Sequence, residues 1–271
     1  MQLQNSHERF EKRGIKVAAI SYDSHAILKD FADRHKIDFP LLADPDSKII
    51  RSFNLLNAEA TGMTQGMAYP GYYYLDRDGI IREAFFDPNY VNRYTANNVL
   101  AKLFPELAAE VASTVKAPHL ELTLEQSDRT AIPGSHLSLI AELRLAPDVH
   151  VYSPGVAGYR PIQLQLEASP EIDPAAVVYP QPKNLYLKAI KENVPVFEGK
   201  FRIVEDVKVA ATRDFIGSLG TEGRTIAVKG ELQYQACDAR VCYPPAKVPV
   251  EWQLLVVPID RQRSPEAIRH K

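Results

Sequence analysis

The second half of the chain repeats one pattern that restricts the possible folds more than any other feature. Between about residues 117 and 258, short runs of alternating apolar and polar residues follow one another, and Pro and Gly interrupt them. The runs are HLELTLEQ, HLSLIAELRL, IQLQLEA, FRIVEDVKVAA, TIAVKGELQYQ and VPVEWQLLVV. Alternation puts the apolar side chains on one face of each strand, and two such sheets can bury these faces against each other. The pattern predicts an all-β sandwich.

The first part of the chain alternates strand-like and helix-like stretches instead. Residues 15–22, IKVAAISY, form an apolar run of strand length, which is typical of a strand buried on both faces. A helix is expected after Ser24, because serine is a preferred helix N-cap. The stretch YYYLDRDGIIREAFF predicts a hairpin closed by Asp78 and Gly79. A further helix is expected over residues 91–113. This order predicts an α/β domain.

Length and composition fit two folded domains. A chain of 271 residues with 45% hydrophobic and 24% charged residues lies in the ordinary globular range. We therefore expect an α/β domain over residues 1–114, a short hinge, a β-domain over residues 117–258 and a solvated tail over residues 259–271. The net charge of −2 and the absence of a Lys/Arg cluster argue against nucleic acid as a partner.

The sequence also bears on membranes and export. Apolar runs stop after about eight residues, whereas a membrane-spanning helix needs about 20. We expect no membrane span. The first residues, MQLQNSHERFEKRG, show no secretory signal, so composition alone leaves the compartment open.

The α/β part resembles the redoxin branch of the thioredoxin-like fold, the AhpC/TSA or peroxiredoxin-like family. FEKRGIKVAAISYDS, FPLLADPDSKIIRSFNL and AYPGYYYLDRDGIIRE carry this resemblance over most of residues 1–113. A cis-proline precedes the third strand in that family, and the resemblance implies that Pro70 is its counterpart. From sequence alone, only about 5 to 6% of X-Pro bonds in folded proteins are cis.

One feature of that family is missing. Its chemistry needs a cysteine at the start of the first helix, where the helix dipole favours a thiolate. No cysteine precedes Cys237 in this chain. The domain is therefore expected to lack its first strand and active-site cysteine, either because the chain begins partway along that helix or because the domain is degenerate and kept for binding.

The only two cysteines, Cys237 and Cys242, could be structural, metal-binding or redox-active. A disulfide that closes a loop of about six residues contributes only about 2 kcal/mol, against about 4.7 kcal/mol for a loop of 100. The pair is expected on neighbouring strands, a place where a bridge is easily reduced. These points favour a redox pair. Arg240 would stabilise a thiolate and Asp238 would oppose it, and the sequence does not say which dominates.

Metal binding is the weakest interpretation of the pair. A closed site needs four ligands, and no histidine lies close in sequence to either cysteine. His150 is the one plausible supplement, although a lone strand histidine is more often structural. We therefore expect no metal and no cofactor.

The frame YQACDARVCYPP resembles the active-site segment of the DsbD N-terminal domain family, whose members are immunoglobulin-like. LAPDVHVYSPG and VPVFEGKFRIVEDVKV extend the resemblance over roughly residues 118–257. Cys237 and Cys242 would be the first and second active-site cysteines, here with four residues between them. The resemblance implies a dithiol–disulfide shuttle between a membrane-embedded thiol reductase and thioredoxin-like proteins, in the periplasm or another extracytoplasmic space.

Several aromatic residues are candidates for shielding the pair. Tyr152, Tyr234 and Tyr243 are expected around the thiols, although core packing is the more common role for aromatics in a sandwich. In the family an aromatic-bearing cap loop covers the cysteines. The resemblance implies that this cap lies between Leu185 and Phe197, with Phe197 as a candidate.

The sequence thus predicts thiol–disulfide exchange through Cys237 and Cys242 with thioredoxin-like proteins or domains. Two alternatives stay open. The chain could be a peroxiredoxin-like antioxidant protein whose catalytic cysteine lies upstream, or a non-catalytic interaction module with a structural disulfide.

Overall fold

The structure is a computed structural model that describes residues 2–105, 110–187 and 191–269. The chain divides into two compact units, one of residues 1–103 with 259–271 and one of residues 104–258. No helix in the described ranges is both long and apolar enough to cross a membrane.

The first unit is built from short helices and strands. Its elements are α1 (Gln2–Glu11), β1 (Ala19–Ser21), α2 (His25–His35), β2 (Leu41–Ala43), α3 (Lys48–Ser52), η1 (Gly62–Thr64), β3 (Gly71–Leu75), β4 (Ile81–Phe86), β5 (Arg93–Tyr94), α4 (Ala96–Leu103) and η3 (Glu266–Ile268).

The predicted helix after Ser24 is confirmed. The Ser24 hydroxyl accepts a hydrogen bond from the Ile27 amide at 3.4 Å, so it caps α2 as the sequence indicates. The predicted hairpin is confirmed too, because β3 and β4 pair antiparallel. Gly79 in its turn has φ +78°, a left-handed conformation that glycine adopts without a steric penalty.

Two predictions for this unit are wrong. The run 15–22 yields only a three-residue strand, β1, and Ile20 in it is 37% exposed. Within the described residues, β1 pairs with β2 alone, so it is not buried on both faces. The helix expected over 91–113 ends at Leu103. Pro105 explains this end, since proline removes a backbone donor and disfavours helical geometry just before it.

The expected solvated tail differs from the structure at one point. Ser264 is buried, and the Asp30 carboxylate accepts its hydrogen bond. Asp260 lies 3.8 Å from His35, measured between Oδ2 and Nε2. Part of this tail therefore packs on α2.

The second unit is the predicted β-sandwich. Its elements are β6 (Glu110–Ala117), β7 (Leu120–Gln126), β8 (Thr130–Ala131), β9 (Ser135–Leu145), β10 (His150–Tyr152), β11 (Gln163–Leu166), β12 (Ile172–Pro174), β13 (Lys183–Leu187), β14 (Glu192–Glu198), β15 (Lys200–Val209), α5 (Arg213–Ser218), β16 (Arg224–Tyr234), β17 (Ala236–Cys237) and β18 (Ala246–Val256).

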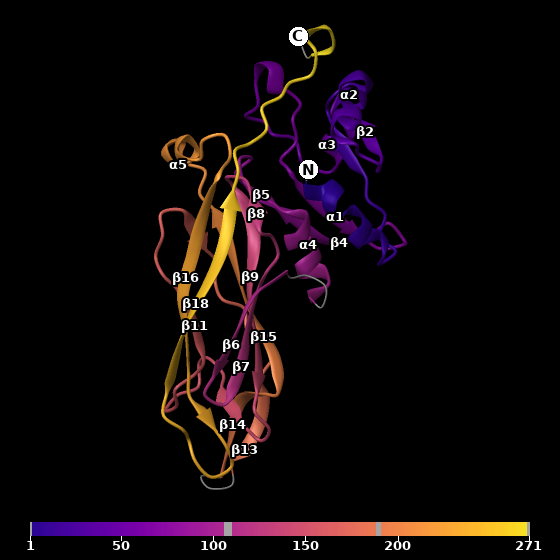
Figure 1. Cartoon of the computed structure of the whole chain (residues 1–271). Coiled ribbons are helices and arrows are strands. Elements are labelled where there is room, and N and C mark those ends of the chain that lie inside the picture. The colour runs from indigo at the N-terminus through magenta and orange to yellow at the C-terminus, as the bar shows by residue number, and fades with distance from the viewer. Residues whose placement is uncertain (1, 106–109, 188–190, 270–271) are drawn as a thin grey trace. The chain divides into compact units, whose positions relative to one another are not determined.

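Each of the six alternating runs contains one of these strands, which confirms the strand prediction. One sheet has the order β12-β15-β9-β7-β6 and another the order β11-β16-β18-β8. Figure 1 shows these sheets as the two long layers of the sandwich. A third sheet, β13-β14-β10-β17, lies at the end of the sandwich opposite α5 and carries the first cysteine (Figure 1).

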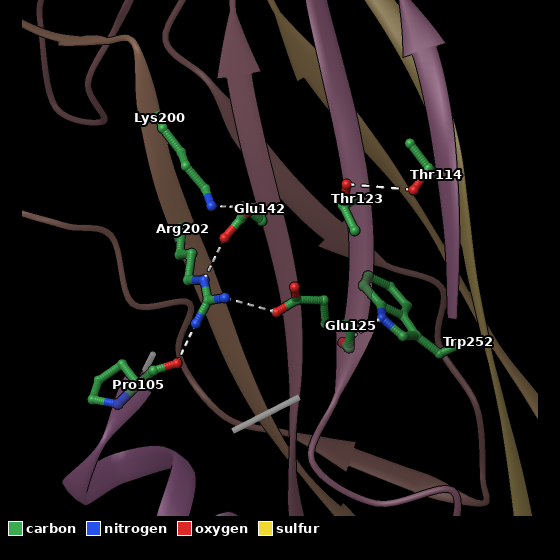
Figure 2. A network of polar contacts seen from close by, with 8 residues as sticks. All are labelled: Pro105, Thr114, Thr123, Glu125, Glu142, Lys200, Arg202 and Trp252. Atoms are coloured by element: carbon green, nitrogen blue, oxygen red, sulfur yellow. Dashed lines mark hydrogen bonds and ion pairs between the residues drawn. The ribbon is translucent and has the colours of Figure 1, made fainter. Parts of the chain in front are cut away.

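The core lies between the two long sheets. Trp252 on β18 is fully buried, and its indole Nε1 donates to the Glu125 carbonyl of β7 at 2.9 Å (Figure 2). Gln126 Nε2 donates back to the Gln253 carbonyl at 3.0 Å. These bonds join the two layers and satisfy polar groups that burial would otherwise leave unpaired.

Arg202 on β15 contacts three charged or polar partners on the outside of its sheet. Its Nε donates to Glu142 at 2.8 Å and its Nη2 lies 3.1 Å from Glu125 Oε2. Its Nη1 donates to the Pro105 carbonyl, and Lys200 pairs with Glu142 at 2.8 Å (Figure 2). This network ties the start of the second unit to three strands, away from the cysteines.

Candidate redox site

Cys237 and Cys242 form a disulfide in the structure, and their Cα atoms lie 4.0 Å apart. Cys237 ends β17, and the Asp238 amide donates to the Val241 carbonyl at 2.9 Å, which closes a tight turn between the cysteines. The Tyr243 amide then donates to the Ala236 carbonyl at 2.8 Å. The two sulfurs are thus held at the base of one short backbone loop.

The two cysteines differ sharply in exposure. Cys237 is 1% exposed, whereas Cys242 is an exposed residue. An incoming thiolate attacks a disulfide at one sulfur and releases the other. Accessibility therefore favours attack at Cys242, with Cys237 as the sulfur that leaves into the protein interior.

Asp238 organises the turn between the cysteines. Its Oδ1 accepts from the backbone amides of Arg240 and Val241 at 2.7 and 2.9 Å, and its Oδ2 accepts from the Tyr243 hydroxyl at 2.7 Å. These hydrogen bonds, with the one from Tyr243 contributing most, lower the pKa of Asp238 to about 2. The carboxylate is therefore charged at neutral pH. Its hydrogen bonds hold the loop between Cys237 and Cys242 in place.

Tyr152 is the aromatic residue that approaches the sulfurs. Its hydroxyl oxygen lies 3.6 Å from the Cys242 sulfur, within hydrogen-bonding distance for sulfur. The side chain is buried, and burial raises its pKa, with Tyr159 adding to the shift. The neutral phenol can donate a hydrogen bond to a sulfur that gains negative charge.

The other three aromatic candidates have other ring or hydroxyl partners. Tyr243 stacks on the His119 ring with 3.7 Å between centroids. The Tyr234 hydroxyl donates to the Pro118 carbonyl at 2.7 Å, and burial raises its pKa to about 12. Phe197 stacks on Phe201 in the main core. Tyr234 and Phe197 therefore pack between the long sheets and are not in the cluster that contains Cys237.

The hairpin β13–β14 covers the buried cysteine from the side. Cys237 forms a small apolar cluster with Tyr152, Val194 and Val196, and Leu185 and Leu187 pack against it. The predicted cap region, residues 185–197, supplies most of these side chains. The tip of this hairpin, residues 188–190, lies outside the described residues.

His150 and Glu198 are the polar neighbours that sequence reasoning did not place. His150 is directly opposite Cys237 in the β10–β17 register and directly opposite Glu198 in the β10–β14 register. His150 is 3% exposed. One pattern could have indicated this, because His150 and Tyr152 are two residues apart on a strand and so share a face.

Two remaining expectations concern geometry and metals. The prediction of a cis bond before Pro70 is wrong, since the structure has no cis peptide bond within its described residues. The trans form is the one that X-Pro bonds ordinarily prefer. In the same ranges, no group of three or more His, Cys, Asp or Glu side chains is arranged to hold a metal ion.

Comparison with known families agrees with the division into two units. Residues 1–84 match the AhpC/TSA family, and residues 121–252 match the family described as thiol:disulfide interchange protein DsbD, N-terminal. The chain is thus similar to the first family in its first unit and to the second family in its second unit. The two matches and the bonded cysteine pair connect the chain to thiol–disulfide chemistry.

Individual relatives match only parts of the chain. Alkyl hydroperoxide reductase C of Staphylococcus aureus is 32% identical over 95 residues, and that of Staphylococcus haemolyticus is 30% identical. These matches cover 34% of this chain, and the chain spans about half, 48%, of the length of these relatives.

Two solved structures are also similar. The N-terminal periplasmic domain of ScsB from Proteus mirabilis has a TM-score of 0.37 at 14% identity, over 54% of this chain and 51% of that one. The reduced N-terminal domain of Neisseria meningitidis DsbD has a TM-score of 0.29 at 14% identity, over 44% and 78%.

Proposed function

We propose that this protein carries out reversible thiol–disulfide exchange through Cys237 and Cys242, with a thioredoxin-like protein or domain as its partner. The observation that carries the proposal is the asymmetry of the pair, in which Cys242 is an exposed residue and Cys237 is a 1% exposed one. A couple of this kind offers a partner one point of attack and one leaving sulfur.

The exchange proceeds in two balanced steps. A thiolate of the reduced partner attacks the Cys242 sulfur, a mixed disulfide forms, and the bond to Cys237 breaks with both of its electrons remaining on Cys237. The second thiol of the partner, as a thiolate, then attacks the partner's own sulfur in the mixed disulfide and releases Cys242. The partner is oxidised to a disulfide, and the pair is reduced as two protons are taken up, one at the Cys242 sulfur and one at the Cys237 sulfur or at a base beside it.

A purely structural role explains the pair less well. A bridge across about six residues constrains the unfolded chain by only about 2 kcal/mol. The fold does not depend on it for a core, because the sandwich already buries Trp252 and many aliphatic residues between its long sheets. A stabilising bridge also gains nothing from an exposed sulfur.

The proposed partner and compartment come from the family match. The description "thiol:disulfide interchange protein" for residues 121–252 supports exchange with another protein's thiols. We propose the periplasm or a comparable extracytoplasmic space as the compartment, and a membrane-embedded thiol reductase as the second partner.

The direct test mixes the oxidised full chain with reduced thioredoxin and follows the loss of thioredoxin thiols. Wild type and the loop control Ala239→Ser should oxidise one equivalent of thioredoxin. The double variant Cys237→Ser/Cys242→Ser should oxidise none. A wild-type disulfide that thioredoxin leaves intact over the same time would contradict the proposal.

The AhpC/TSA match supports a second candidate, peroxide reduction. That reaction needs a peroxidatic thiolate, and residues 1–236 contain no cysteine. Peroxide consumption by the reduced chain that persists in the double serine variant would favour this function. Its absence in wild type would exclude it for this chain.

A further inference from the structure

His150 lies between an acidic residue and the leaving cysteine. In the third sheet it is opposite Glu198 of β14 on one side and opposite Cys237 of β17 on the other. Residues directly opposite on antiparallel strands point to the same face, with Cβ atoms about 4.5 to 5.5 Å apart. The imidazole, the carboxylate and the sulfur therefore share one face of this sheet.

The imidazole is buried with an unused nitrogen. His150 is 3% exposed, and its Nε2 has no hydrogen-bond partner in the described part of the chain. A buried polar atom without a partner costs free energy, so it is usually satisfied in some state of the protein. The ring of Tyr152 meets it edge-on, with 5.5 Å between centroids.

The oxidised protein holds this histidine neutral. Burial lowers the pKa of the His150 imidazole, and the negative charges of Glu198 and Asp238 oppose that shift without overcoming it. A further negative charge nearby would act in the same direction as these two carboxylates and raise the affinity of His150 for a proton.

Opening the disulfide creates that negative charge. When Cys242 forms a mixed disulfide, Cys237 leaves as a thiolate inside an apolar cluster where an uncompensated charge is expensive. The titratable and charged groups around it are His150 and Tyr152 of β10, Glu198 of β14 and Asp238 of the turn, with Tyr159 beyond Tyr152. Two exposed cations lie further out, Arg240 in the turn beside Asp238 and Lys183 of β13, which pairs with Glu198 at 3.8 Å. His150 is the buried member of this set that can become a cation.

We propose that His150 takes up a proton from solvent as the disulfide opens and holds it beside Cys237, so that the buried sulfur is released as part of an imidazolium–thiolate pair. This proposal rests on the proposed exchange function and deepens it. No bond forms to His150. The S–S electron pair stays on Cys237, and one proton binds to the imidazole. The Tyr152 hydroxyl remains available to donate a hydrogen bond to the Cys242 sulfur.

The first test measures the acidity of Cys237 in a full chain that carries Cys242→Ser, so that one thiol remains. The thiolate is followed by carbon-13 NMR of labelled cysteine across pH. Adding His150→Gln should raise the pKa of Cys237 by at least one unit, which is a tenfold loss of thiolate below that pKa. The matched control His136→Gln, a half-buried histidine on β9, should leave it unchanged. Equal titrations in all three proteins would overturn the proposal.

The second test needs no substitution and covers the case in which His150→Gln does not fold. The imidazole of His150 is titrated by NMR in the wild-type chain, once oxidised and once reduced with dithiothreitol. The pKa of His150 should be at least one unit higher in the reduced protein. An identical pKa in both states would overturn the proposal, since a structural histidine would not sense the redox state.

These outcomes are separable from those of the exchange test. If thioredoxin reduces the wild-type disulfide and neither titration shows coupling, the role of His150 is wrong and the proposed function stands. If the titrations show coupling and thioredoxin leaves the disulfide intact, the exchange function is wrong and the His150–Cys237 pair stands.

Discussion

The two units of this chain bury their apolar residues to different degrees. In the first unit, the described strands β1 with β2 and β3 with β4 form two separate two-stranded sheets, and Ile20 and Leu42 are 37% and 50% exposed. In the second unit, long sheets enclose a continuous core in which Leu137 is fully buried. Both cysteines belong to the second unit. The proposed chemistry therefore resides on the better-packed scaffold.

The largest effect should come from a matched pair of leucine truncations. Leu137→Ala removes a fully buried side chain and should lower the free energy of unfolding by about 2 to 5 kcal/mol. Leu42→Ala removes a half-exposed one and should cost less than about 1 kcal/mol. Urea unfolding of the full chain, followed by hydrogen exchange in each unit, checks both values. Equal losses would contradict the difference in packing.

One carboxyl group in each unit, Glu205 in the second and Asp76 in the first, should contribute oppositely to the pH dependence of stability. Glu205 on β15 is buried toward the core, and burial raises its pKa from 4.5 to about 7. A raised carboxyl pKa means that the folded state binds the proton more tightly than the unfolded chain. The stabilisation is fully present below about pH 4.5 and is lost as pH rises through about 7, by about 3 kcal/mol.

The expected readout is a sandwich that becomes less protected from hydrogen exchange between pH 5 and 8. Glu205→Gln should remove this dependence, whereas the exposed control Glu222→Gln should retain it. In the first unit, hydrogen bonds to the Asp76 carboxylate, that from the Ile80 amide first, lower its pKa, so its contribution is lost as pH falls instead. A Glu205→Gln variant with the wild-type pH profile would refute this assignment.

Single-cysteine variants should separate the two sulfurs. Cys237→Ser leaves the exposed thiol and Cys242→Ser leaves the buried one. Reaction with 5,5′-dithiobis(2-nitrobenzoic acid) should be about a hundredfold faster for the first variant at the same pH, a difference of about 2.7 kcal/mol in barrier. Comparable rates would show that burial does not control access to Cys237.

The smallest expected effect is that of reduction on stability. Reducing the disulfide should lower the stability of the sandwich by about 2 kcal/mol, because the closed loop is short. Hydrogen exchange in the first unit should not change. A loss of 4 kcal/mol or more in the sandwich would indicate a structural bridge.

The sequence predicts the sandwich well because its signal is periodic. Each alternating run has an apolar face and a polar face, and packing against a second sheet is enough to bury the apolar face. Residues 15–22 are predicted less well, since an apolar run says nothing about how many strands pair beside it. The helix expected over 91–113 ends before Pro105, because a proline disrupts a helix even where the apolar spacing continues beyond it.

The site shows the same limits. Cys237 and Cys242 stand out because they are the only cysteines and form one short loop. Tyr152 and His150 reach the pair through strand β10, some 85 residues away in sequence, so only the register of the third sheet brings them together. The burial of Cys237 depends in part on side chains of the β13–β14 hairpin, which no local pattern near the cysteines reveals.

The most direct measurement traps the first step of exchange with a protein partner. The oxidised full chain is incubated with a thioredoxin whose second active-site cysteine is replaced by serine, so that the mixed disulfide cannot resolve, and the linked peptides are identified by mass spectrometry. We expect one adduct, joined through Cys242. A control confirms that the partner's remaining thiol reacts with a small disulfide reagent at its normal rate. An adduct joined through Cys237 would contradict exchange at Cys242. The absence of any adduct with a partner that passes this control would contradict it too.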